Sequence, residues 1–203
     1  MTFKISKKYD RTDWSRLGLV SVSDNNWNEA TEIINDRFKS RFFNHIDMIK
    51  NDKTSGFLVM SIDCLIIETL MQFYLGVEDT VTSYPGKQAK AFKDFFKHST
   101  HFNGEFDTDI KRHEFYKQFR CGLLHQAEVK NKSLIKIKRK SLLELVNDAN
   151  VSEGLIIDRE KFHQKLVLEF NDYLEKLSSN QNNFNGESLR DKAILKMNII
   201  CRL

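Results

Sequence analysis

Apolar side chains recur every three or four residues along most of this chain, which is the spacing of amphipathic helices. The clearest stripe follows Asp24 and another follows Asp158, and both acids are good helix N-cap residues. The first stripe comprises Trp27, Ala30, Ile34, Phe38, Phe42, His45 and Ile49, and the second comprises Phe162, Leu166, Phe170, Tyr173, Leu174 and Leu177. Each stripe predicts a long helix that packs one face against a core.

Four further helices are predicted, over residues 57–75, 87–97, 109–129 and 188–201. The first of these is apolar on most of its circumference, so we expect it in the middle of a bundle, with Gly76 as its C-cap. The third follows a polar loop and begins at a cap, either Asp107 or Thr108.

Alternation of apolar and polar residues at 133–138 predicts a β-strand. Residues 155–157 are its expected partner in a small hairpin, and residues 141–146 fit either a short helix or a third strand. Residues 1–23 have no clear period and are expected to form an extended lead-in. Together these patterns predict an all-α bundle of five to six helices with a small β-hairpin insertion.

Composition agrees with a helical protein. The 203 residues include one proline and eight glycines, too few turn-forming residues for a fold of many short strands. Sixteen phenylalanines suit helices that pack through large side chains. We expect a single domain, with core helices in 24–129, the hairpin insertion in 130–158 and C-terminal helices in 159–203.

Charge and cysteine content exclude only a few classes of protein. The formal charge of +4 permits binding to an acidic polymer without requiring it. Cys64, Cys121 and Cys201 include no CxxC pair, which favours free thiols over disulfides or a zinc site. The first residues lack an apolar core of signal-peptide length, and polar residues interrupt the apolar stretch at 56–75. We therefore expect a cytoplasmic protein with no membrane span.

Several catalytic motifs are missing, among them the phosphate-binding glycine loop, the zinc-protease motif and the serine-hydrolase motif. His98 and His101, with Glu105, Asp107 and Asp109 downstream, offer groups that could bind a metal. Their spacing matches no standard ligand pattern, so we expect solvated loop residues. The sequence predicts neither a metal nor a cofactor.

The helix at 109–129 holds the most informative residues. Arg120 and His125 lie about 140° apart around a regular helix. Gly122 between them costs roughly 1 kcal/mol relative to alanine, which indicates a distorted turn or a close approach by another backbone. Glu68 lies among apolar residues of the central helix and needs a partner, which Arg120 could supply. Asp63 is a second, weaker partner on that helix.

The run Arg-Cys-Gly-Leu-Leu-His at 120–125 resembles the active-site segment of the HEPN superfamily. These all-α bundles carry an arginine, four to six residues and then a histidine, and many are metal-independent endoribonucleases. They dimerise so that two motifs converge in one cleft, and they often act as toxins or antiviral effectors. The resemblance covers about residues 24–128. It implies a homodimer, an RNA substrate, and an antitoxin or defence-system partner.

The resemblance also implies roles for individual residues. His125, with a reference pKa of about 6.5, would act as the general base or acid toward an RNA 2′-hydroxyl. Arg120 would bind the phosphate and stabilise its growing charge, with Glu68 and Cys121 in support.

Two alternatives remain open. Cys121 stands where nuclease members commonly carry asparagine, aspartate or histidine. This favours a catalytically inactive HEPN-like module that binds a nucleotide, RNA or a protein. The second alternative is a helical scaffold in which Arg120 and His125 are locked to Glu68.

A basic segment directly follows the motif and comprises Lys130, Lys132, Lys136, Lys138, Arg139 and Lys140. A solvated hairpin face is the ordinary interpretation of such a run. Its position also allows these lysines to guide an RNA backbone toward His125 through phosphate contacts. Phe115, Tyr116 and Phe119 could stack on bases, but their helical spacing favours core positions.

Overall fold

The computed structural model describes residues 3–20, 25–148 and 151–203. The helices are α1 (Arg11–Ser15), α2 (Trp27–Phe38), η1 (Lys39–Phe43), α3 (Asn44–Ile49), α4 (Gly56–Leu75), α5 (Lys87–His98), α6 (Asp109–Glu114), η2 (Phe115–Arg120), α7 (Cys121–Gln126), α8 (Arg159–Ser178) and α9 (Leu189–Cys201). The strands are β1 (Leu134–Lys136), β2 (Leu143–Asp148) and β3 (Val151–Asp158). The protein is therefore mostly helical with one small sheet.

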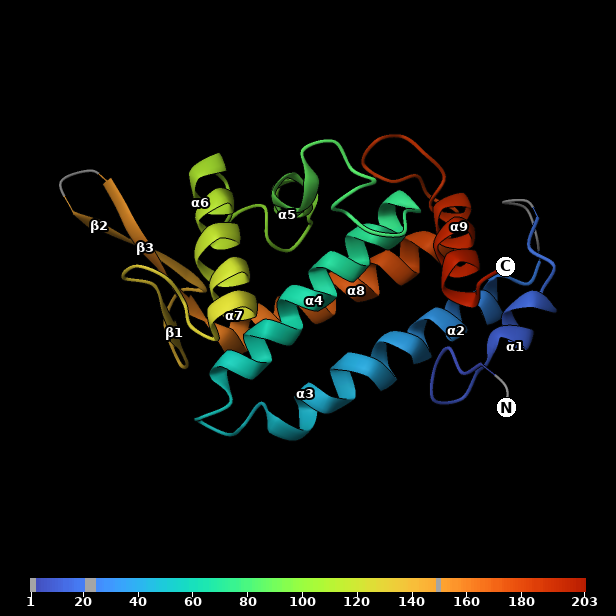
Figure 1. Cartoon of the computed structure of the whole chain (residues 1–203), viewed down its shortest axis with the longest axis horizontal. Coiled ribbons are helices and arrows are strands. Elements are labelled where there is room, and N and C mark those ends of the chain that lie inside the picture. The colour runs from blue at the N-terminus through green and yellow to red at the C-terminus, as the bar shows by residue number, and fades with distance from the viewer. Residues whose placement is uncertain (1–2, 21–24, 149–150) are drawn as a thin grey trace.

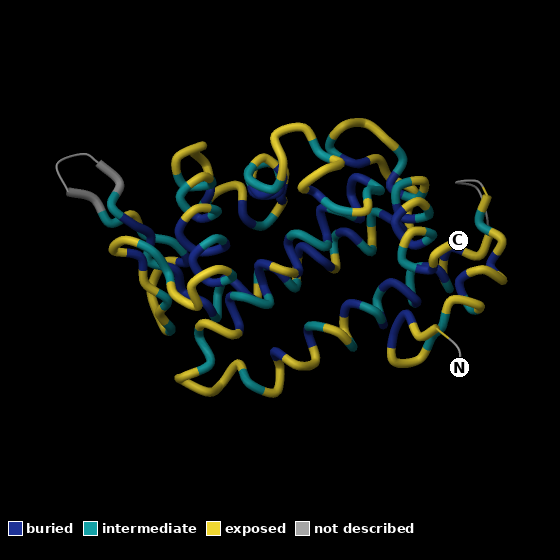
Figure 2. The backbone as a smooth tube through the Cα atoms, viewed as in Figure 1, coloured by how far each residue is buried: buried dark blue, intermediate teal, exposed yellow. Residues whose placement is uncertain are grey.

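Two long helices, α4 and α8, run through the centre of the molecule (Figure 1). The continuous rod of α2, η1 and α3 lies on one side of them, and the rod of α6, η2 and α7 lies near the sheet at one end. Both chain termini lie at the opposite end, beside α1 and α9. Buried residues gather along α4 and α8, whereas the outer turns of α3 and α6 are exposed (Figure 2).

The predicted helices are present, and several predicted caps are observed. Thr108 accepts a hydrogen bond from the Lys111 amide, and Asp158 accepts one from the Lys161 amide. Asn26 occupies the N-cap of α2, and Asp24, the predicted cap, lies outside the described residues. The two π-helical segments, η1 and η2, were not predicted, because a wider turn leaves the three-to-four-residue apolar spacing nearly unchanged.

α4 occupies the core, as its apolar circumference predicts. It is long and apolar enough to cross a membrane by length and composition, but 67% of its most apolar window is buried inside the protein. It ends at Gly76, whose φ of 66° lies in the left-handed region that favours glycine. A Cβ at Gly76 would lie 3.1 Å from the backbone of Lys192, so this glycine also lets α9 pack closely.

The sheet differs from the predicted hairpin. β1 pairs with β3 as expected, with Ile135 opposite Ile157, but the two strands run parallel. The antiparallel pair is β2 with β3, so residues 141–146 contribute the third strand, and β3 lies in the middle. The prediction was wrong because alternation reveals a strand but not its direction, and the chain reverses at the β2–β3 connection.

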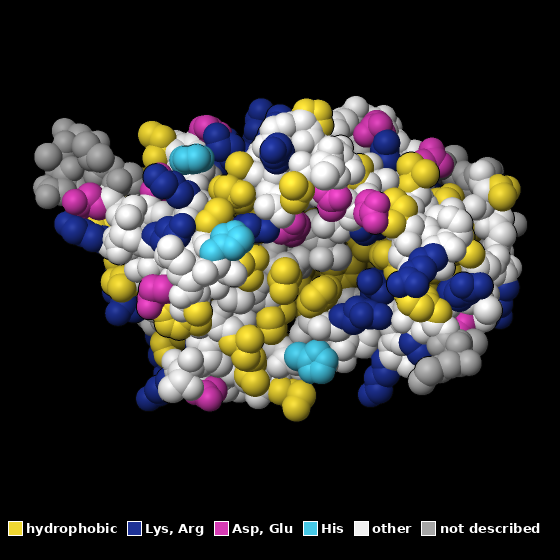
Figure 3. Space-filling view, in the orientation of Figure 1, with side chains coloured by type: hydrophobic (Ala, Val, Ile, Leu, Met, Phe, Trp, Pro, Cys, Tyr) yellow, Lys and Arg dark blue, Asp and Glu magenta, His cyan; other side chains and the backbone are white. Residues whose placement is uncertain are grey.

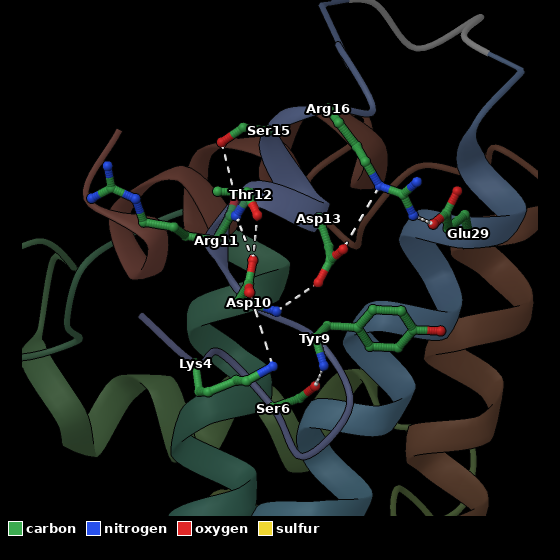
Figure 4. A network of polar contacts seen from close by, with 10 residues as sticks. All are labelled: Lys4, Ser6, Tyr9, Asp10, Arg11, Thr12, Asp13, Ser15, Arg16 and Glu29. Atoms are coloured by element: carbon green, nitrogen blue, oxygen red, sulfur yellow. Dashed lines mark hydrogen bonds and ion pairs between the residues drawn. The ribbon is translucent and has the colours of Figure 1, made fainter. Parts of the chain in front are cut away.

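The lead-in is not simply extended, since it contains α1. The Asp10 carboxylate accepts a hydrogen bond from the Thr12 amide, and the Asp13 carboxylate accepts one from the Asp10 amide (Figure 4). This reciprocal arrangement is a capping box, which satisfies amides that a short helix leaves unpaired. An ion pair between Arg16 and Glu29 then joins the end of α1 to α2.

An aromatic cluster fixes the rod of α6, η2 and α7 against α5 and α8. Phe115 of η2 stacks on Phe119 at 5.3 Å and on Phe162 of α8 at 5.2 Å between ring centroids. Phe96 of α5 meets Phe115 edge-on at 4.9 Å. Phe115 and Phe119 are fully buried, which supports their assignment to the core rather than to base stacking. This packing determines where the end of η2, and hence Arg120, lies.

Candidate functional site

A polar cluster forms around Glu68 where α4, α5 and the end of η2 meet. Glu68 Oε2 accepts a hydrogen bond from Arg120 Nη2 at 3.1 Å, so the predicted Arg120–Glu68 pair is present. Glu68 Oε1 accepts from Gln88 Nε2 at 2.6 Å and from Thr80 Oγ1 at 3.3 Å. The Glu68 side chain is 13% exposed, and these donors compensate for its removal from water.

Arg120 is held at the buried end of this cluster. The residue is 7% exposed, and its guanidinium lies 5.9 Å from the ring centroid of Tyr116. Burial opposes the charge, but the hydrogen bond and the negative charge of Glu68 outweigh it, so the pKa of Arg120 is raised. Among the described residues, Nε has no hydrogen-bond partner. Arg120 therefore stays cationic and retains donor capacity.

His125 lies at the exposed edge of the cluster. Its Nε2 is 3.4 Å from Arg120 Nη1, although regular helical geometry separates the two Cα positions by about 140°. The long arginine side chain spans that angle. Because a guanidinium can only donate, Nε2 must accept, which assigns the proton of the neutral imidazole to Nδ1. His125 is an exposed residue, so solvent reaches this edge of the cluster.

Gly122 allows the chain that follows α7 to pass close to the helix. A Cβ at this position would lie 2.4 Å from the carbonyl oxygen of Glu128, a contact that no side chain tolerates. The chain reverses directly after α7 through Ala127, at a φ of 53°, and the Lys130 amide then donates to the Gln118 carbonyl at 3.1 Å. Gly122 thus permits the close backbone approach that its place in a helix predicted.

Cys121 lies beside the cluster and is half-buried, with no disulfide partner. Burial and the neighbouring Cys121 raise the pKa of Tyr116, so the phenol stays protonated near neutral pH. Cys64 and Cys201 are buried free thiols. Burial raises the pKa of both, so neither thiol is set up as a nucleophile at neutral pH.

Asp63, the weaker predicted partner of Arg120, has a different role. Its Oδ1 lies 2.8 Å from Nδ1 of His163 on α8, and Asp63 is completely buried. Burial raises its pKa, against the opposing effect of His163. Sequence reasoning missed His163, although two signals were available. First, His163 lies three residues before Leu166, and so close to the apolar face of its helix. Second, Asp63 is an acid on an apolar helix and therefore requires a partner.

The basic segment divides into paired and unpaired residues. Lys132 forms an ion pair with Glu153 and Arg139 forms one with Glu144, both at 2.6 Å. Lys136 and Lys138 are exposed, and neither makes an ion pair with a described residue. Lys130 is half-buried directly after the reversal that follows α7. Of these residues, Lys136 and Lys138 are therefore the ones most available for phosphate contacts.

His98 and His101, considered as metal ligands, have separate partners. His98 stacks on Phe184 at 4.7 Å, and His101 lies 3.7 Å from Asp172. Within residues 3–20, 25–148 and 151–203, no group of three His, Cys, Asp or Glu side chains could hold a metal ion. No protein-family model, curated protein or solved structure matches the chain.

Proposed function

We propose that this chain is a HEPN-like, metal-independent endoribonuclease that acts in the cytoplasm as a toxin or phage-defence effector. One observation carries the proposal. An exposed histidine, His125, lies 3.4 Å from a buried, permanently charged arginine, Arg120, that an internal carboxylate holds in place. Such a pairing puts a proton-transfer group beside a phosphate-binding group.

The reaction would be a transesterification. The imidazole of His125 takes the proton of an RNA 2′-hydroxyl, and the resulting oxyanion attacks the adjacent phosphorus. The bond to the 5′-oxygen breaks, a protonated histidine donates a proton to that leaving oxygen, and a 2′,3′-cyclic phosphate remains. Arg120 stabilises the charge on the phosphate oxygens through Nη1, the nitrogen beside His125, because Nε is buried.

A homodimer would bring a second histidine to the leaving oxygen. Figure 3 shows a strip of hydrophobic side chains over the middle of the molecule, where α4 runs in Figure 1. Leu58 is 54% exposed and Leu65 is 42% exposed, and they lie seven residues apart on one helix face. Leu65 precedes Glu68 by one helical turn. A second copy that covers this strip would place the two Arg120–His125 pairs in one cleft.

A binding module without catalysis is the second candidate, and two observations favour it. Glu68 already neutralises Arg120, so a phosphate must share the guanidinium with a buried carboxylate. Cys121 is half-buried beside Arg120 and contributes no strong hydrogen-bond donor to a phosphate. Such a module would bind RNA through Arg120 and leave it intact.

The test is incubation of purified protein with a mixed pool of single-stranded and structured RNA in EDTA. Wild-type protein is expected to produce fragments with 2′,3′-cyclic phosphate ends, and His125→Ala is expected to lose at least about a hundredfold in rate. His113→Ala is the matched control, because His113 is exposed on α6 of the same helical rod and lies outside the cluster.

RNA binding without cleavage by the folded wild-type dimer would establish the binding module instead. The dimer is tested by sedimentation, with Leu65→Asp expected to be monomeric and inactive. Leu168→Asp changes a leucine on α8 that is 49% exposed, against 42% for Leu65, and should leave both the dimer and the activity intact. A wild-type protein that is monomeric while cleaving RNA would exclude the shared cleft.

A further inference from the structure

A cavity of about 190 Å³, separate from the Glu68 cluster, lies between α4, α5, α8 and the loop that follows α8. Tyr74 near the end of α4, His98 at the end of α5 and Lys176 in the last turn of α8 all line it. The loop between α8 and α9 crosses this region (Figure 1), and its Asn183 donates a hydrogen bond to the Tyr74 carbonyl at 2.9 Å. The helix ends and the loop are therefore held together.

Residues close to helix C-termini form part of the cavity lining, most directly at the end of α5. The last carbonyl groups of a helix point outward from its C-terminus and carry the negative end of the helix dipole, equivalent to about half an elementary charge. Cations are stabilised at such positions and anions are destabilised. Protein donors already bond the carbonyl groups of Tyr74 in α4, from Asn183, and of Leu177 and Ser178 in α8, from Arg190, so any dipole contribution comes mainly from the end of α5.

Glu169 adds a full negative charge with unused acceptor capacity. It is 2% exposed and lines the cavity. Its Oε2 accepts from Ser99 Oγ at 2.6 Å and from the His101 amide at 3.2 Å. Among the described residues, Oε1 has no hydrogen-bond partner. Oε1 is not sealed from solvent, so a donor that enters the cavity can reach it.

The other charged groups that line the cavity already have partners. Asp94 forms an ion pair with Lys90 and accepts a hydrogen bond from Tyr84. The ammonium group of Lys176 is 3.6 Å from Asp172. Burial lowers the pKa of His98, so its imidazole is neutral at physiological pH. Glu169 therefore dominates the charge that an incoming ligand would meet.

Aromatic side chains form the remaining walls. Tyr74 is 7% exposed and Phe95 is 3% exposed, and Phe184 of the loop also lines the cavity. The Tyr74 and Phe184 rings are 6.1 Å apart between centroids. The faces of such rings attract cations, most strongly where water is excluded.

We propose that this cavity binds a small organic cation, namely a primary alkylammonium group that donates to Glu169 Oε1 and packs its alkyl chain against Tyr74, Phe95 and Phe184. The cavity is smaller than sites for drug-sized ligands, which limits the occupant to a short amine or to the end of a longer one.

Isothermal titration calorimetry with n-butylammonium, n-butanol and butyrate tests the proposal. The three probes have nearly the same size and differ in charge. The full-length protein is expected to bind n-butylammonium at least about tenfold more tightly than n-butanol, and to show no binding of butyrate. Equal affinity for the ammonium and the alcohol, or no binding of the ammonium, would overturn the proposal.

Glu169→Gln keeps the shape of the side chain and removes its charge. It should weaken n-butylammonium binding by at least about tenfold and leave n-butanol binding unchanged. Glu175→Gln is the matched control, because it removes the same charge from an exposed position on α8. Unchanged ammonium binding in a folded Glu169→Gln protein would contradict the proposal.

A second variant keeps the test decisive if Glu169→Gln does not fold. Phe184→Leu removes an aromatic wall from a loop and keeps an apolar surface. It should weaken n-butylammonium binding more than n-butanol binding, since only the cation interacts with the ring face. An equal effect on both probes would show that the cavity is merely apolar and would overturn the proposal.

Discussion

α4 carries two acids, five residues apart, whose surroundings differ sharply. Asp63 is completely buried and bonds to His163 of α8, whose side chain is only 8% exposed. Glu68 bonds to Arg120 at the edge of the core, and the histidine of that group, His125, is exposed. Both acids bond to a side chain of another helix, but only the Glu68 group includes an exposed residue, His125.

The difference shows how the same residue types serve stability in one place and reactivity in another. The Asp63–His163 pair joins two core helices, and removal of one partner leaves a buried group unpaired. The Glu68 carboxylate instead holds a cation in position beside an exposed imidazole. A group at the edge of the core is rigid enough to be oriented and open enough to meet a substrate.

The largest effect is expected at the buried pair. His163→Leu leaves Asp63 without a partner in the core and should lower the free energy of unfolding by about 3–5 kcal/mol. The double variant with Asp63→Leu should recover most of this loss, because both polar groups are then gone. Urea denaturation of the single and double variants measures both effects, and a double variant no more stable than the single would contradict the assignment.

At the edge cluster we expect a smaller loss. Glu68→Ala removes a charge-assisted hydrogen bond from Arg120 and should cost about 1.5–3 kcal/mol in the free energy of unfolding. Glu105→Ala is the control, because the Glu105–Lys165 pair at 2.6 Å is partly exposed and should contribute at most about 1 kcal/mol. Equal losses in the two variants would show that Glu68 is no more than a surface partner.

Gln72, another polar residue of α4, holds a buried lysine that, within the described residues, has no carboxylate as its hydrogen-bond partner. It accepts from Lys196 Nζ at 2.7 Å, and the Glu78 carbonyl accepts from the same atom at 2.8 Å. Burial lowers the pKa of Lys196 to about 8 from 10.5.

Between these two pKa values the unfolded chain binds one more proton than the folded protein. The contribution of Lys196 to stability should therefore rise as pH increases from about 8 to 10.5. Urea denaturation across this range, compared with Lys196→Met, isolates the contribution. A difference between the two proteins that does not change with pH would contradict the lowered pKa.

The smallest effect on stability is expected at His125. Because the ring is exposed, His125→Ala should change the free energy of unfolding by no more than about 0.5 kcal/mol, while it removes RNA cleavage. A loss of several kcal/mol would instead assign His125 to the structural part of the cluster, as in the scaffold interpretation.

The sequence predicted the helices well because their apolar stripes are long and regular. It also predicted the Arg120–Glu68 pair, since a buried acid and a nearby helical arginine have few other ways to be satisfied. It did not predict the roles of Thr80 or Gln88, because single polar residues in a connection or in the first turn of a helix carry no signal that identifies their partner. The α1 capping box was readable from Asp10 and Asp13 at the spacing typical of such boxes.

Other features depend on tertiary contacts that a local pattern cannot show. The parallel pairing of β1 with β3 depends on where β1 lies against the start of α4, near Gly56 and Ile135. The π-helical turn before Arg120 depends on how Phe115 and Phe119 fit between α5 and α8. The resemblance of residues 120–125 to HEPN nucleases therefore supports a proposed activity, and catalysis needs its own test.

The most direct test of that activity uses one defined RNA and the same RNA with a single 2′-deoxy nucleotide at the cleaved linkage. Both are incubated with wild-type protein in EDTA. The mechanism predicts cleavage of the all-ribose substrate and none at the 2′-deoxy linkage, because the attacking hydroxyl is gone. Cleavage of both substrates at equal rates would contradict a reaction in which His125 activates the 2′-hydroxyl.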